Sequence, residues 1–196
     1  MLTDRCLLLL QNPGEGGLRI IPEQALAGML AGALLFDLAI AGKIDNDAHD
    51  LVIMNRTPSG TPLLDFGLDQ LPDDNQPIPL PEMVTILAVQ AARILANGTA
   101  RLHWLGLLRT NALTPDGREK IRSLQAELHA LLDDPAVIPD PEEVMLLGLT
   151  EAGQLWPILF TADQLAAHRQ RLQQLARLEF IRSEEHTSEL QSPNTI

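Results

Sequence analysis

The feature that most constrains this chain is an almost uninterrupted apolar stretch from Ala25 to Ala41. It has the length of a long helix, and it contains a single charged residue, Asp37. A membrane-spanning helix needs about 20 consecutive apolar residues with few or no charges, and this stretch falls short of that. A helix that is apolar nearly all round is otherwise found inside a folded domain. The stretch therefore predicts a buried core helix that begins near Pro22 and is ended by Gly42 as its C-cap.

The composition favours a core made of helices. Of 196 residues, 45 % are apolar, only 3 % are aromatic, and tyrosine is absent. The core must therefore be built from leucine, isoleucine, valine and alanine, which favours helices over a β-sandwich. We predict one mainly α domain over residues 1–181: a compact helical core ringed by amphipathic helices and loops, with a small β-hairpin. Residues 43–50 are predicted as a turn leading into a strand over 51–54, and a hairpin strand is expected over 101–109.

Helical periodicity and boundary residues predict further helices around the central one. The first is expected to be capped by Thr3 or Asp4, and the helix before Gly98 is expected to end there. Gly28 and Gly32, four residues apart on the central helix, are expected to let another helix pack closely. The further helices are predicted over residues 2–10, 63–71, 82–97, 116–132, 139–153 and 162–181.

The charge balance excludes some classes of partner. The net charge is −12, whereas binding to nucleic acid or to anionic lipid needs clustered lysine and arginine. We therefore expect no nucleic-acid partner. Cys6 is the only cysteine, so no internal disulfide can form, and its apolar surroundings predict a buried thiol. No signal peptide is apparent, and we expect a cytoplasmic protein, either free or peripheral at a membrane.

No motif predicts catalysis or metal binding. None of the histidines before residue 182 lies three or four residues from another histidine or cysteine, which argues against a local zinc site: His49, His103, His129 and His168. The chain has no nucleophile elbow, no P-loop and no dinucleotide-binding fingerprint, and the glycines of residues 14–17 predict a turn. Acidic pairs such as Glu142 and Glu143 suit a helix N-terminus, although acids could still converge in space. We expect no enzyme activity, no cofactor and no metal.

The last residues differ abruptly from the helical pattern before them. Residues 182–192 read RSEEHTSELQS, which resembles the conceptual translation of a common sequencing-library adapter. We therefore predict that residues 182–196 are a non-native, adapter-derived tail and that the native C-terminal sequence beyond about residue 181 is missing.

Several motifs occur in a specific order along the chain. The strongest are GALLFDLAIAGKI at residues 32–44 and PSGTPLLD at 58–65; weaker ones are ANG at 96–98, LGLL at 105–108 and PDPEEVMLLGLTEAGQL at 139–155. Together, over residues 2–181, they resemble the Golgi phosphoprotein 3 family, and a bacterial-type member in particular. The resemblance implies a helical core ringed by amphipathic helices and loops, with a small β-hairpin.

The resemblance also implies a lipid site. In eukaryotic members this fold binds phosphatidylinositol 4-phosphate at Golgi membranes and retains glycosyltransferases through their cytosolic tails, and its lipid pocket uses a tryptophan and three arginines. Aligned by hand, the tryptophan position falls on Pro22 and the arginine positions fall on Ala31, Val84 and Leu87. The helix that carries the last two contains one basic residue, Arg93. The family's basic lipid site is therefore expected to be absent from this chain.

In the family a hydrophobic hairpin enters the bilayer, and its counterpart here is expected between Gly98 and Leu105, about three residues shorter. Leu102, Trp104 and Leu105 are the candidate membrane contacts; the alternative is that they pack on the helical core.

Two functions remain open for this non-catalytic binding or adaptor protein. The first is a peripheral membrane protein that binds a phosphoinositide, which the resemblance transfers. The second is a bacterial-type scaffold on the same fold that binds a protein partner and no phosphoinositide. An enzyme, the third reading, has no supporting motif.

Overall fold

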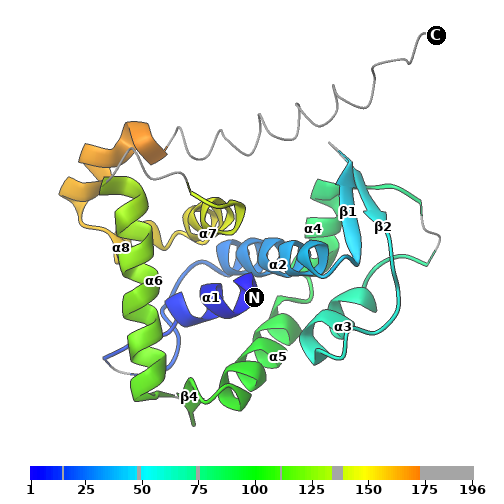
Figure 1. The fold of residues 1–196 in the computed structure, drawn as a ribbon, viewed down its shortest axis with the longest axis horizontal. Coiled ribbons are helices and arrows are strands. Elements are labelled where there is room, and N and C mark those ends of the chain that lie inside the picture. Colours follow the sequence, from blue (N-terminus) through cyan, green and yellow to red (C-terminus); the bar gives the residue numbers. More distant parts are fainter. Residues whose placement is uncertain (15, 48–49, 74–75, 111, 134–138, 173–196) are drawn as a thin grey trace.

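The described part of the chain is mainly helical, as predicted (Figure 1). The computed structural model describes residues 1–14, 16–47, 50–73, 76–110, 112–133 and 139–172. The helices are α1 (Leu2–Leu9), α2 (Glu23–Ile40), α3 (Pro62–Leu68), α4 (Leu80–Ala88), α5 (Ala91–Trp104), α6 (Pro115–Asp133), α7 (Pro141–Ala152) and α8 (Trp156–Leu159), and residues 162–172 are also helical. The strands are β1 (Ile44–Asp47), β2 (Asp50–Ile53), β3 (Ile78–Pro79), β4 (Leu108–Arg109) and β5 (Ala112–Leu113).

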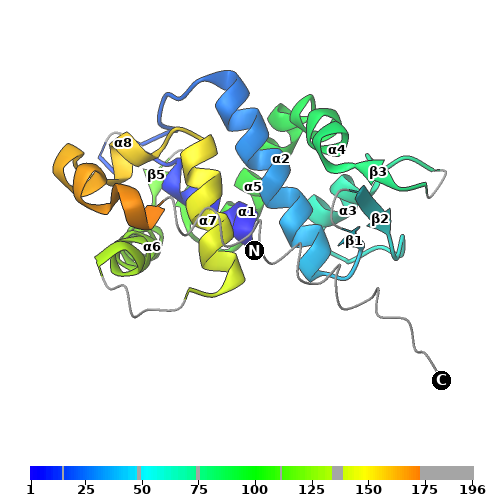
Figure 2. The same cartoon turned by 90° about the horizontal axis from the view of Figure 1, so that it is seen from above.

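Helix α2 lies at the centre of the fold, as its apolar sequence predicts. Figure 2 shows it running between α1, α6 and α7 on one side and α3, α4 and the sheet of β1, β2 and β3 on the other. Pro22 is its N-cap, and Gly42 follows its C-cap with a φ of 65°. The N–H of Gly42 donates to the carbonyl of Ala39, and that of Lys43 to the carbonyl of Leu38, which is a Schellman motif. The predicted ends of this helix are confirmed.

By length and composition alone α2 could also cross a membrane, and so could α4 and α5 if their bent pair were one span. Almost half of α2 is buried inside the fold, and a core helix passes the same test.

The small sheet forms where only one strand was expected. β1 pairs antiparallel with β2, with Ile44 opposite Ile53, and β2 pairs with β3 through Leu51 and Ile78. Ile44, Leu51 and Ile78 of this sheet are buried in the core, whereas Asp45, next to Ile44, is exposed. The prediction that residues 43–50 form a turn was therefore wrong. The segment is rich in aspartate and asparagine, which are typical of turns, so its sequence did not indicate a strand.

The hairpin strand predicted over residues 101–109 is confirmed only at its end, Leu108–Arg109, because residues 101–104 are helical. α5 continues past Gly98 to Trp104, and only a two-residue ladder, Leu108 and Arg109 with Ala112 and Leu113, follows it. Gly98 does not end the helix, because it is buried where α5 crosses α1. A Cβ added there would overlap the Leu7 side chain. The helix predicted over 82–97 is also two helices, since α4 and α5 are bent by 74° relative to each other.

The remaining helix predictions are mostly confirmed. α3, α6 and α7 match the helices expected near residues 63–71, 116–132 and 139–153, and 162–172 forms the described part of the last one. Asp140 and Glu143 form a capping box at the start of α7. Of the two glycines on α2, Gly32 does permit close packing, because an added Cβ would lie 2.7 Å from Leu149 Cδ2, whereas Gly28 faces open space.

The predicted caps of α1 were wrong. Thr3 and Asp4 lie inside the helix, and its N-cap, Met1, makes no side-chain capping bond. The carboxylate of Asp37, on α2, takes that place: it accepts the N–H of Leu2 at 2.6 Å and that of Thr3 at 2.9 Å. The one charge of the central helix therefore caps a different helix.

Candidate functional site

The four positions aligned with the lipid contacts do not share a surface. Pro22 is exposed at the start of α2, whereas Ala31 of α2 and Leu87 of α4 are each 0 % exposed in the core. Val84 is partly buried against the same core. A charged headgroup could reach Ala31 or Leu87 only by entering the apolar interior, at a large desolvation cost.

No lysine or arginine lies on α2 or α4. The basic residue nearest to α4 along the chain is Arg93, at the start of α5, and its guanidinium lies 4.6 Å from the ring centroid of Phe66 on α3. This cation–π contact holds Arg93 against α3. Arginine forks that could grip a phosphate are thus absent from α2 and α4.

The predicted membrane contacts lie at the end of α5 and not on a hairpin. Leu102 is 0 % exposed and packs in the core, so its assignment as a membrane contact was wrong. Trp104, two residues further along, is 79 % exposed, and Leu105 is 39 % exposed. A two-residue step turns a side chain to the opposite side of a helix, which explains the contrast between Leu102 and Trp104.

Ion pairs anchor α1, which is otherwise buried. Arg101 of α5 donates its Nε to both carboxylate oxygens of Asp4, at 2.9 and 3.1 Å. Arg5 contacts the carboxylates of Glu127 on α6 and Glu142 on α7, the latter at 3.2 Å. These pairs join residues about a hundred positions apart, so no local pattern could reveal them. They link α1 to α5, α6 and α7 and pair the charges of Asp4 and Arg5.

Two further buried groups have shifted acidities. Burial raises the pKa of Asp37, and hydrogen bonds from Thr3 and from the N–H of Leu2 oppose the rise. Burial, with the nearby Asp37 charge, also raises the pKa of the Cys6 thiol. Cys6 is 0 % exposed, as the sequence predicts, and a thiol of raised pKa is a poor nucleophile.

Among the described residues no three histidine, cysteine, aspartate or glutamate side chains come together as a metal site would require. His168 Nε2 lies 3.0 Å from Asp133 Oδ1, and Gln164 contacts His129. Both histidines thereby hold the helix over 162–172 against α6. His103 lies on α5, with Nδ1 3.1 Å from the carbonyl of Leu108, and His49 falls outside the described residues.

The described residues also enclose a half-open cavity of about 410 Å³ between the turn after α1 and the start of α6. Its one charged lining group is Arg118, which donates to the carbonyl of Leu113 at 2.7 Å. The lining residues are Asn12, Pro13, Gly14, Gly16, Thr110, Ala112, Leu113 and Arg118. Such a lining, mostly backbone and small side chains, contains no pair of groups suited to acid–base or nucleophilic catalysis.

The model of the family described as Golgi phosphoprotein 3 (GPP34) matches residues 2–189. No curated protein matches the chain. The matched range includes residues 182–189, which resemble the adapter, so the domain boundary near residue 181 stays a prediction.

Proposed function

Because the chain belongs to the Golgi phosphoprotein 3 (GPP34) family, we propose that it is a non-catalytic adaptor that binds a protein partner and does not hold a phosphoinositide through the family's basic site. The fold alone does not fix this function, and the proposal depends on the chemistry of the aligned positions.

The burial of Ala31 and Leu87 is the observation that carries the proposal. Both side chains are apolar and both belong to the continuous hydrophobic core. An arginine at either place would need to leave the core or carry its charge into it, and neither suits a surface lipid site. The net charge of −12 adds long-range repulsion toward an anionic bilayer.

A peripheral membrane protein is the second candidate, and the exposed Trp104 favours it. Tryptophan is enriched at membrane interfaces, where an apolar ring with one polar group suits the headgroup level. Leu105 beside it is also partly exposed. This contact would need no phosphoinositide, because it depends on the ring and not on an arginine cluster.

Co-sedimentation with liposomes separates the two candidates. Vesicles of phosphatidylcholine with and without phosphatidylinositol 4-phosphate are pelleted with the wild-type chain and with Trp104→Ala, at low and high salt. We expect no pelleting that depends on the phosphoinositide. Pelleting that needs phosphatidylinositol 4-phosphate and is lost at high salt contradicts the proposal, whereas lipid-independent pelleting that is lost in Trp104→Ala supports the second candidate.

A further inference from the structure

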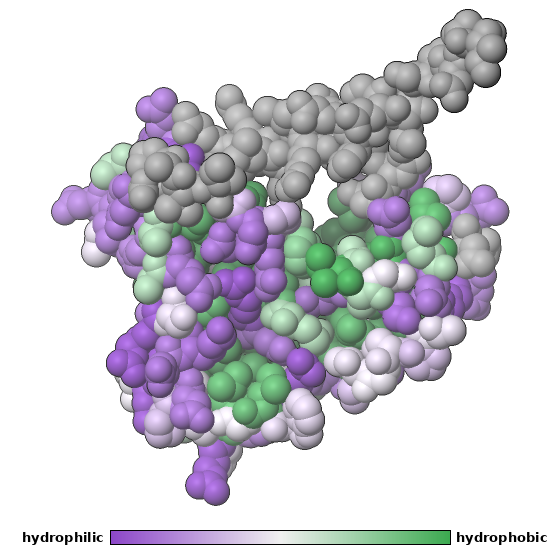
Figure 3. Space-filling view, in the orientation of Figure 1, coloured by the Kyte–Doolittle hydropathy of each residue, from purple (hydrophilic) through white to green (hydrophobic). Residues whose placement is uncertain are grey.

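We draw no further inference here: the strongest candidate, the exposed apolar surface patch over the end of α2 beside the sheet (Figure 3), where Ile40 is 75 % exposed and Met54 is 62 % exposed, carries nothing, because nothing in the structure shows what covers it.

Discussion

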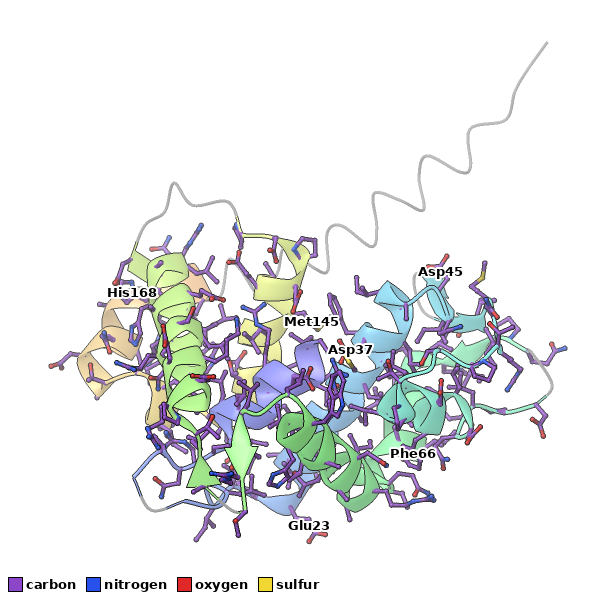
Figure 4. The ribbon with its side chains drawn as sticks, turned by 60° about the horizontal axis from the view of Figure 1, so that its bottom comes forward. Glu23, Asp37, Asp45, Phe66, Met145 and His168 are labelled. Carbon is purple, nitrogen blue, oxygen red and sulfur yellow. The ribbon has the colours of Figure 1, made fainter. Side chains whose placement is uncertain are left out.

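The carboxylate of Asp37 on α2 accepts the backbone N–H of Leu2 at 2.6 Å, across 35 positions of sequence. Its other oxygen accepts the N–H of Thr3 at 2.9 Å. These are N–H groups at the first turn of α1, which have no partner within their own helix. Two core helices, α1 and α2, are therefore joined by a capping interaction at Asp37 (Figure 4) as well as by apolar packing.

Replacing Asp37 should destabilise the fold strongly. Asp37→Ala leaves two buried N–H groups without an acceptor, and we expect a loss of about 2–4 kcal/mol in the free energy of unfolding. Asp37→Asn keeps one acceptor oxygen and should lose less. Urea unfolding followed by circular dichroism measures both. A loss below about 0.5 kcal/mol in Asp37→Ala would mean that the cap contributes little.

The stability contributed by Asp37 should depend on pH with an unusual sign. Burial raises its pKa above the ordinary value of 3.8, so the native state holds its proton more tightly than the unfolded state. This contribution is fully present below pH 3.8 and is lost as the pH rises through the raised native value. As the pH rises through this range, the wild type should therefore lose stability relative to Asp37→Asn. Urea midpoints measured across the acidic range for both chains test it, and parallel curves would contradict it.

Gln154→Gly should stabilise the chain. Gln154 follows the C-cap of α7 with a φ of 55°, a conformation that glycine adopts without steric cost. The N–H of Leu155 donates to the carbonyl of Thr150 at 2.8 Å, which completes a Schellman motif around it. We expect a gain of about 0.5–1 kcal/mol. The measurement is the shift in thermal midpoint, and a lower midpoint would contradict the argument.

The glycine at the preceding position has a different role. Gly153 packs on the central helix, because an added Cβ would lie 2.5 Å from Met29 Sδ. The control substitution Gly153→Ala should therefore destabilise the chain. Gly153 is thus required for helix packing, and Gln154, the residue after it, has the positive φ.

Two glycine-to-alanine substitutions should have opposite effects. Gly98→Ala places a methyl group against the buried Leu7 side chain, and we expect a loss of about 1–3 kcal/mol. Gly28→Ala meets open space in the middle of α2 and should gain about 0.5–1 kcal/mol from helix propensity. Both values come from the same urea titration. Effects of the same sign would mean that packing around these glycines differs from that described.

Local sequence patterns predicted the elements but not the contacts between them. The extent of α2 followed from its apolar residues and from Pro22 and Gly42, which act within one turn of their own helix. Gly98 packs against Leu7, which lies on a different helix. Because no local pattern shows that contact, the sequence predicted Gly98 as a helix end. Likewise, Asp37 accepts the N–H groups of Leu2 and Thr3 only because α1 and α2 cross there. The charge of Asp37 in the sequence did not indicate that it caps another helix.

The candidate site also has one part that the sequence predicts and one part that only the packing of the helices reveals. Sequence comparison identified the family and showed that Pro22, Ala31, Val84 and Leu87 lack charge. The burial of Ala31 and Leu87, which bears on whether any headgroup could reach them, became visible only in the packing of α2 on α4.

The most direct test of the adaptor proposal is a titration of the wild-type chain with soluble, short-chain phosphatidylinositol 4-phosphate in a calorimeter. Because the aligned positions carry no basic group and two of them are buried, we expect no saturable heat up to about 1 mM lipid. Saturable binding with a Kd in the micromolar range, weakened by salt, would contradict the proposal and place the chain among phosphoinositide-binding members of its family.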